Sequence, residues 1–329
     1  MKRMRRRRPA RKRATRRSKV LGSGRRTGTS CERFPLAARI MSCMARKMPA
    51  AFLGHGSPMN ALEVNRFTAE WRAFGASVPR PRAILVVSAH WFVNVSAVTA
   101  MARPRTIHDF YGFPKKLFEV EYPAPGDRGV AEEVAEISKP TYVGLDLDGW
   151  GLDHGTWSLL VHAFPSADVP VVQLAIDARK GPDFHFELGA KLAPLRERGV
   201  LIIGSGNIVH NLRAIDWSLQ DEGFDWARRY DERARELLVE YPSEIVSLVD
   251  HPDHSRAVPT PDHFLPMLYF AGLTAAAKEK AKILVDGYAY GSLSMTSYTV
   301  DAAPPAVAAT EPAARIPDPS VVPPEDTNL

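Results

Sequence analysis

The sequence predicts an α/β fold, in which a single domain holds a central, mostly parallel sheet with helices on both faces. Short apolar runs rich in β-branched residues alternate with segments of helical periodicity, which is the pattern of a sheet covered by helices. The chain has 329 residues and a hydrophobic fraction of 45%, enough for one large packed core. No period of 20 to 50 residues repeats, which argues against a solenoid.

The strands are expected where apolar runs are short and bounded by turn residues, at 50–53, 83–88, 169–176 and 200–204. Apolar residues at helical spacing predict helices at 60–74, 128–137, 156–164, 184–198 and 225–241. Asn60 suits the N-cap of the first helix, and Pro242 ends the last one.

Charge divides the chain sharply. Residues 1–47 hold 18 Lys or Arg and one acid, Glu32, so this segment carries +17 and leaves −11 for the rest of a chain whose net charge is +6. We interpret residues 1–47 as a basic disordered leader, 48–301 as the folded domain, and 302–329 as a loose tail rich in Pro and Ala. The folded domain is therefore acidic.

Three interpretations of the leader remain open. A start codon placed too early fits because Met41, Met44 and Met48 all precede the first strand. A polybasic arm that binds nucleic acid or another polyanion fits the charge, and an Arg-rich organelle transit peptide fits the scarcity of acids. None of the three predicts nucleic-acid binding by the domain itself.

The two cysteines, Cys31 and Cys43, both fall in the leader, so the domain has neither a disulfide nor a thiolate metal ligand. No run approaches 18 apolar residues, which predicts no membrane span, and the leader lacks the apolar middle of a secretory signal. We expect a soluble, cytoplasmic protein.

Three histidines follow predicted strands at the places where ligands bind in open α/β sheets. His55 comes after AAFL in the turn GHGSPMN, His90 ends ILVVSAHW, and His210 lies just past LIIGSGN. Each such position exposes its ring at the carboxyl edge of the sheet. A lone histidine is more often a satisfied polar residue than a ligand, but a group of them at strand exits favours a metal site.

Two further histidines occupy shaped turns. His263 lies in PTPDHFLPML before an apolar helical run, although Asp262 and Thr260 could simply cap that helix. His154 lies in GLDHGTW, next to Asp153 and before a helix. The other five histidines have plainer settings.

Other motifs carry less weight. GSGN at 204–207 lacks the full G-x-G-x-x-G pattern of dinucleotide sites, and GHGSP around Ser57 lacks the spacing of a nucleophile elbow. A zinc-dependent hydrolase remains the alternative, because the same histidines could hold Zn²⁺ and a bound water.

Six motifs in fixed order, GHGSPMNAL, SAHW, HDFYGFP, GLDHGTW, GSGNIVHNL and PTPDHFLP, resemble those of class III (LigB-type) extradiol dioxygenases, in particular the 4,5-DOPA dioxygenase-like branch. The resemblance extends from about Met48 to Val300. It implies ring cleavage of a catechol-type, DOPA-like aromatic diol by O₂.

The resemblance also implies site residues. A divalent metal would be held by His55, His90 and His263, with His210 as a fourth ligand or an acid/base, and His154 would contact substrate and transfer protons. Relatives elsewhere in the superfamily use two His and one Glu, which leaves Fe²⁺ a net charge of +1, whereas three imidazoles leave +2. Iron(II) is expected for ring cleavage, and zinc for the isolated protein, because imidazole sets also suit Zn²⁺.

Aromatic residues beside these motifs are expected to form the pocket for the substrate ring. Tyr111 and Trp91 are the predicted substrate contacts, although ordinary core packing explains such residues equally well.

Overall fold

The computed structural model describes residues 47–302. The predicted leader and tail lie almost wholly outside the described residues. Within 47–302, no helix is both long and apolar enough to cross a bilayer.

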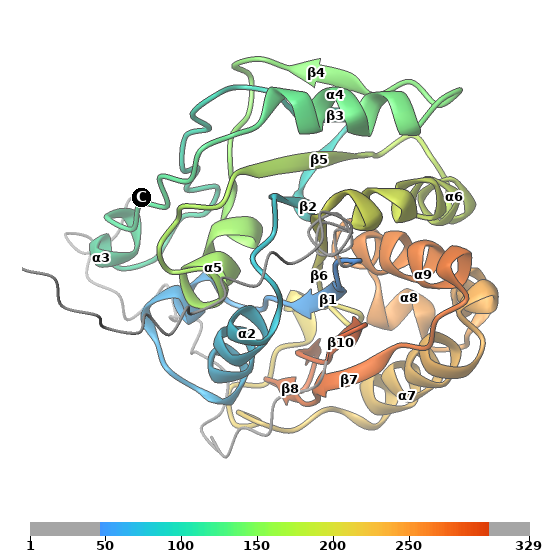
Figure 1. The fold of residues 1–329 in the computed structure, drawn as a ribbon. Helices are drawn as coiled ribbons and strands as arrows, with labels where there is room; N and C mark the ends of the chain where they lie inside the picture. The colour runs from blue at the N-terminus through green and yellow to red at the C-terminus, as the bar shows by residue number, and fades with distance from the viewer. Residues whose placement is uncertain (1–46, 303–329) are drawn as a thin grey trace, which may run out of the picture. The chain divides into compact units, whose positions relative to one another are not determined.

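One mixed sheet of eight strands runs through the domain in the order β4-β3-β5-β2-β6-β1-β10-β7 (Figure 1). The four central strands β5, β2, β6 and β1 are parallel, whereas β10 and β7 join one edge antiparallel and β3 pairs antiparallel with β5. A separate hairpin is formed by β8 and β9. The strands span β1 (Ala50–Gly54), β2 (Ala83–Val93), β3 (Ala97–Thr99), β4 (Gly144–Asp146), β5 (Val171–Asp177), β6 (Val200–Gly206), β7 (Lys282–Val285), β8 (Tyr288–Ala289), β9 (Leu293–Ser294) and β10 (Ser297–Val300).

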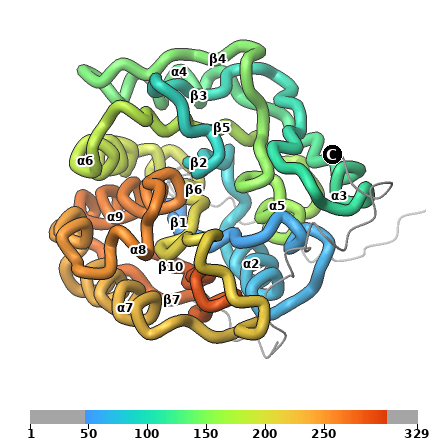
Figure 2. The backbone as a smooth tube through the Cα atoms, turned by 180° about the vertical axis from the view of Figure 1, so that it is seen from behind, coloured from blue at the N-terminus to red at the C-terminus, as the bar shows by residue number. Residues whose placement is uncertain are grey.

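Helices cover both faces of the sheet, as predicted. Figures 1 and 2 show α2 and α5 together on one side and α6 and α9 on the other. The helices span α2 (Arg66–Ser77), α3 (Lys115–Phe118), α4 (Arg128–Ile137), α5 (His154–Ala163), α6 (Pro182–Leu192), α7 (Asp225–Glu240), α8 (His254–Ala257) and α9 (Leu265–Ala277), with 3₁₀ turns η1 (Pro58–Leu62), η2 (Ala193–Arg198), η3 (Leu212–Ala214) and η4 (Pro242–Asp250).

The central strands are apolar on both faces because both faces are buried. In β1, Ala50 and Phe52 join the core cluster under α6 and α9, whereas Ala51 and Leu53 join the cluster under α2 and α5. Alternate residues therefore face opposite layers, and the strand is apolar throughout.

The four predicted strands are confirmed as β1, β2, β5 and β6, and the predicted helices correspond to α2, α4, α5, α6 and α7. Three local predictions were wrong. Asn60 is not an N-cap; Asn65 caps α2 through a capping box with Thr68. Helix α6 stops at Leu192, because the ring and missing N–H of Pro194 do not fit a continued α-helix. No side chain caps α9.

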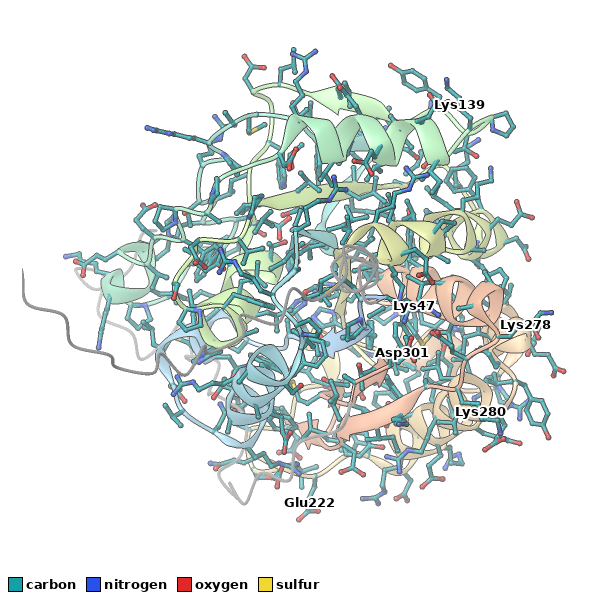
Figure 3. The ribbon with its side chains drawn as sticks, in the orientation of Figure 1. Lys47, Lys139, Glu222, Lys278, Lys280 and Asp301 are labelled. Carbon is teal, nitrogen blue, oxygen red and sulfur yellow. The ribbon has the colours of Figure 1, made fainter. Side chains whose placement is uncertain are left out.

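The two ends of the described domain are tied together. The buried guanidinium of Arg196 lies 2.6 Å from carboxylate oxygens of both Glu279 and Asp301, and its Nε donates to Met48 O over 2.7 Å. Lys47 also pairs with Asp301 at 3.5 Å, and Figure 3 labels both residues. These contacts fix the start of β1 beside the end of β10.

Candidate metal centre

His55 is held at the end of β1 by a tight turn. Its N–H donates to Gly206 O at the end of β6 (3.2 Å), and its carbonyl accepts from Asn60 Nδ2 (3.0 Å). Gly56 has φ +58°, a conformation that a residue with a Cβ rarely adopts. The buried Asn60 thus shapes the turn that presents His55.

His90 owes its orientation to an irregularity in β2. The register between β2 and β5 shifts between Val87 and Phe92, and His90 lies inside this interval. Such bulges re-aim a side chain at functional sites. A Cβ on Gly155 would lie 2.9 Å from His90 Cδ2, so the glycine makes room for the ring.

His154 is the first residue of α5. Asp153 caps this helix by accepting from Thr156 N (3.3 Å), and the same buried carboxylate accepts from Ser88 Oγ (2.7 Å) and Trp150 Nε1 (3.2 Å). Burial raises the pKa of Asp153, and the nearby Asp109 adds to that shift. The hydrogen bonds to Asp153 fix the turn that carries His154.

His210 and His263 come from the loops after β6 and before α9. His210 N donates to Ala257 O (2.9 Å), and Asn207 N donates to His263 O (2.9 Å). The two rings stack with centroids 3.6 Å apart and planes within 3°. Two loops that are 53 positions apart in sequence are thereby brought into contact.

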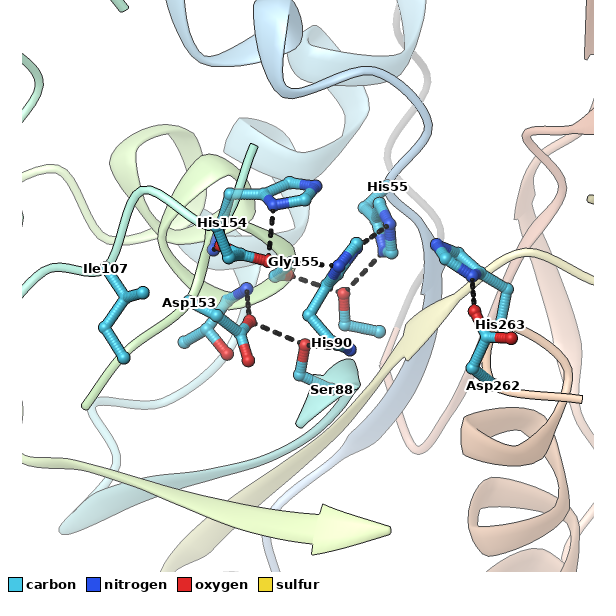
Figure 4. Close-up of polar contacts among 12 residues, drawn as sticks. His55, Ser88, His90, Ile107, Asp153, His154, Gly155, Asp262 and His263 are labelled. Carbon is cyan, nitrogen blue, oxygen red and sulfur yellow. Dashed lines mark hydrogen bonds and ion pairs between the residues drawn. The ribbon is translucent and has the colours of Figure 1, made fainter. Parts of the chain in front are cut away.

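The rings of these five histidines gather in one place, and Figure 4 shows four of them. His55 Nε2 lies 3.1 Å from His90 Nε2, and the centroid of His263 lies 5.2 Å from that of His55 and 4.9 Å from that of His90. One ligand atom each from His55, His90 and His154 lie within 4.8 Å of one another. The ring centroids of His55, His90 and His263, the three predicted ligands, thus lie 4.9–5.2 Å from one another.

The hydrogen-bond network assigns the tautomer of His55. Ser205 Oγ donates to Gly155 O over 2.5 Å, so it accepts from Nδ1–H of His55 over 3.0 Å. His55 Nε2 is then left with a lone pair that faces the other rings. Such second contacts are how proteins fix the tautomer of a metal-binding histidine.

Carboxylates impose the same tautomer on three other rings. Asp109 Oδ2 accepts from Nδ1 of His154 (2.9 Å) and of His90 (3.1 Å), and Asp262 Oδ2 accepts from Nδ1 of His263. The Nε2 atoms of all three rings therefore carry lone pairs. Lone pairs 3.1 Å apart on His55 and His90 repel one another unless a cation or proton lies between them.

The pKa values agree with neutral rings at most of these positions. Burial and the neighbouring histidines hold the pKa values of His55 and His210 well below the usual value. Burial lowers the pKa of His154 to about 4 and also lowers that of His263. For His90, burial is the largest single effect and opposes protonation, but the hydrogen bond to Asp109 and the charges of Asp109, Asp153 and Asp262 together outweigh it, so the pKa is raised.

Asp109 is the partner that the sequence analysis did not single out, although it lies in the quoted motif HDFYGFP. Its Oδ1 accepts from the backbone N–H of His154 (2.9 Å) while its Oδ2 contacts two rings. Burial alone would raise the pKa of Asp109, yet its contacts with His154 and His90 hold the pKa well below the usual value. Asp109 is therefore an ionised acceptor that orients both histidines.

A cavity of about 340 Å³ opens beside the five histidines. Tyr111 lines it, as predicted, and is 78% exposed at the mouth. The predicted substrate contact Trp91 does not line it; Trp91 is buried and stacks on Trp150, with centroids 5.9 Å apart. The sequence analysis missed several apolar lining residues, namely Leu212, Ile215, Trp217 and Leu293.

The donor set fits a divalent metal. Converging Nε2 lone pairs match the ligands of histidine metal sites, and the Nδ1 contacts to oxygen match their outer contacts; these oxygen contacts are made by His55, His90, His154 and His263. Imidazoles suit both iron(II) and zinc, so the residues alone do not choose between them.

Comparison with known proteins identifies the family. Residues 50–301 match the model of the catalytic LigB subunit of aromatic ring-opening dioxygenase. The chain is 46% identical over 270 residues to 4,5-DOPA dioxygenase extradiol of Escherichia coli K12, covering 81% of this chain and 99% of that protein. It is 34% identical over 255 residues to the protein of the same name from Beta vulgaris, covering 75% of this chain and 94% of that one.

A solved structure agrees. The crystal structure of an uncharacterised protein from Escherichia coli K12 superimposes with a TM-score of 0.67 at 42% identity, covering 77% of this chain and 99% of that chain. The zinc-dependent hydrolase that the histidine pattern left open gains no support from these matches. The described domain and its histidine-lined cavity belong to the LigB family of extradiol aromatic ring-opening dioxygenases, and the chain is a member of that family.

Proposed function

We propose that this protein opens the ring of a catechol-type, DOPA-like diol outside its two hydroxyl groups, inserting both atoms of O₂. His55, His90 and His263 would hold a divalent metal, with His210 beside them. The observation that carries the proposal is the convergence of Nε2 lone pairs, with His55 and His90 Nε2 atoms 3.1 Å apart. The names of the relatives support the substrate class.

The metal supplies two kinds of chemistry when bound: it acidifies the catechol hydroxyls and, as iron(II), gives electrons to O₂. Zinc has no redox chemistry, so iron(II) is the ion that we expect for turnover. A set of imidazoles also accepts zinc, which we expect to occupy the isolated protein.

His154 is the proposed proton acceptor for the second hydroxyl. Its Nε2 lone pair faces the cavity histidines, and its Nδ1–H is bonded to Asp109 over 2.9 Å. A proton taken up at Nε2 makes an imidazolium that the Asp109 carboxylate stabilises. His154 then returns the proton as the aromatic ring of the substrate opens. His210, stacked on His263, is the second candidate for this role.

The aromatic wall would orient the substrate ring. Phe110 meets His154 edge to face, with centroids 5.4 Å apart, and packs against Phe113 at 5.2 Å. A flat ring beside Phe110 lies within reach of the histidines, and the apolar wall keeps water away from the reacting atoms.

Oxygen uptake tests the proposal directly. The protein is stripped of metal, loaded anaerobically with iron(II), mixed with a catechol and exposed to air. We expect oxygen uptake and a yellow ring-opened product, and neither with zinc alone. An iron-loaded protein that consumes no oxygen with any catechol of a small panel would refute the proposal.

The third ligand needs its own test, because among the described residues the ligand atoms that lie within 4.8 Å of one another belong to His55, His90 and His154, and His263 is not in this group. We expect His263→Gln to lose bound metal and His154→Gln to keep it, as measured by elemental analysis. The opposite result would exchange the roles of these two residues.

A further inference from the structure

Apart from its histidines, the described wall of the cavity has no ionisable acid or base of the Lys, Arg, Asp or Glu type. Apart from the five histidines and the indole of Trp217, the polar side chains among the described lining residues are those of Ser57 and Tyr111. The charged groups at the site, Asp109 and Asp262, lie behind histidines and are engaged by their Nδ1–H groups.

One side of the mouth is an apolar edge made by residues 212–217. Leu212, Ile215 and Trp217 line the cavity, whereas the intervening Arg213 and Asp216 do not. Asp216 instead accepts from Ser218 N (2.9 Å) and Ser218 Oγ (2.6 Å). The segment thus presents its apolar side chains to the cavity.

This apolar edge is left partly open to solvent. Leu212 is 55% exposed and Trp217 is 46% exposed, which is high for large apolar side chains that line a pocket. Trp217 also meets the buried Tyr290, with centroids 5.3 Å apart, so its ring has a packed backing. An apolar group on a bound ligand would cover this surface and be stabilised by leaving water.

A charged substituent on the ligand would gain no such stabilisation at this edge. An ammonium or carboxylate that moves from water to this edge loses hydration and meets no opposite charge on the wall. An uncharged chain of carbon atoms loses nothing comparable. The apolar edge of the cavity therefore selects among substrates by the substituent on the catechol ring, whereas the histidines act on its two hydroxyl groups.

We infer that the preferred substrate is a catechol with an uncharged, apolar substituent that packs against Leu212, Ile215 and Trp217, and not one with an amino-acid substituent. This inference rests on the proposed ring cleavage. It keeps the catechol ring but departs from the DOPA-like substituent that the names of the relatives support.

A matched substrate series tests it on the full-length, iron(II)-loaded protein. The series keeps the catechol ring and varies the group at position 4: propyl, aminoethyl, carboxyethyl, and the amino-acid group of L-DOPA. We expect kcat/KM from oxygen uptake to be highest for 4-propylcatechol, by about tenfold or more over L-DOPA.

A positive charge placed on the edge should shift the preference toward the anionic compound. Leu212→Arg puts a guanidinium at an exposed position, where folding tolerates it, and should raise the ratio of kcat/KM for the carboxyethyl over the propyl compound by about tenfold. Val64→Arg is the control, because Val64 is 70% exposed and does not line the cavity. It should leave the substrate order as in the wild type.

A second readout needs no metal. Titrating the metal-free protein with 4-propylcatechol should give a saturable change in tryptophan fluorescence that Trp217→Phe largely loses. A change of equal size in that variant would count against contact with Trp217.

The outcomes separate the two claims. Turnover in which L-DOPA equals or exceeds 4-propylcatechol would overturn the inference alone, and loss of that preference in Arg213→Gln would show that Arg213 receives the carboxylate. No oxygen uptake with any of the four catechols would overturn the proposed function and this inference with it.

Discussion

Replacing Asp109 by Asn tests the hydrogen-bond network behind the histidines. The carboxylate accepts from Nδ1 of His154 at 2.9 Å and of His90 at 3.1 Å through one oxygen. An amide is neutral, and the NH₂ group that replaces the second oxygen cannot accept from the backbone N–H of His154 (2.9 Å), so the change loses about one charge-assisted hydrogen bond, about 1.5–3 kcal/mol. At 1.36 kcal/mol per factor of ten, the loss is about 10- to 100-fold, the range found for outer partners of metal ligands.

Two measurements show separately how Asp109→Asn changes metal affinity and turnover. Chelator competition gives the affinity for the metal, which depends on His90, and oxygen uptake at saturating metal gives turnover, which depends on His154. We expect both to fall, with far-UV circular dichroism unchanged. Asp148→Asn, on an exposed turn, is the matched control. An Asp109→Asn protein with wild-type metal affinity and wild-type turnover would refute the idea that this carboxylate orients the two rings.

Three further predictions follow from the same geometry. His55→Ala should lose bound metal while keeping its fold, and full occupancy by elemental analysis would contradict its role as a ligand. His154→Gln and His210→Ala should keep most folded structure, and whichever residue transfers the proton should lose turnover by about 10²- to 10⁴-fold; equal wild-type activity in both would remove this role from each. Burial lowers the pKa of His185 to about 4 from its ordinary 6.5, so protonation favours the unfolded chain as pH falls from 6.5 toward 4. By pH 5 this lowers the free energy of unfolding by about 2 kcal/mol. Denaturant titrations at pH 7 and pH 5 should show that this loss is largely absent in His185→Gln.

The strands that carry the site could be predicted because they are apolar on both faces. Central strands such as β1 and β6 are buried from above and below, so their sequences are continuous apolar runs that end at a glycine or a polar residue. A residue after such a run lies at the carboxyl edge of the sheet. That is why His55 and His210 could be located from sequence.

The strands other than the central four could not be predicted in the same way. Strands β3 and β4 have three residues each, and β8 and β9 have two, which is too short for a pattern of alternation to be recognised. Strand β10 is fully buried but reads SYTV, in which Ser and Thr are satisfied by hydrogen bonds such as Thr299 Oγ1 to Ala50 O. Its position depends on β1, which is about 250 residues away.

The hydrogen bonds that Asp109 and Asp262 accept from the histidines could not be predicted, for a related reason. Asp109 lies in a loop, and only the fold brings it to His90 and His154, 19 positions before it and 45 after it. Asp262 was interpreted as a possible helix cap because it precedes an apolar helix, but its carboxylate is occupied by His263. The local sequence indicates which residues are able to cap a helix, but it does not show whether another side chain occupies the carboxylate instead.

These carboxylates bear on the departure from a site of two histidines and one glutamate. Three neutral imidazoles add no negative charge around a divalent ion, which by itself makes the ion a poorer electron donor. In this structure Asp109 and Asp262 accept hydrogen bonds from the Nδ1–H groups of His90, His154 and His263. Such hydrogen bonds make imidazole a more basic ligand. The negative charge that a glutamate ligand would supply directly is thus present on Asp109 and Asp262, which contact the histidines and would not contact the metal itself. We therefore expect the charge balance of the proposed centre to depend on the acidic partners as well as on the histidines, so that the proposed three-histidine set supports oxygen chemistry together with Asp109 and Asp262.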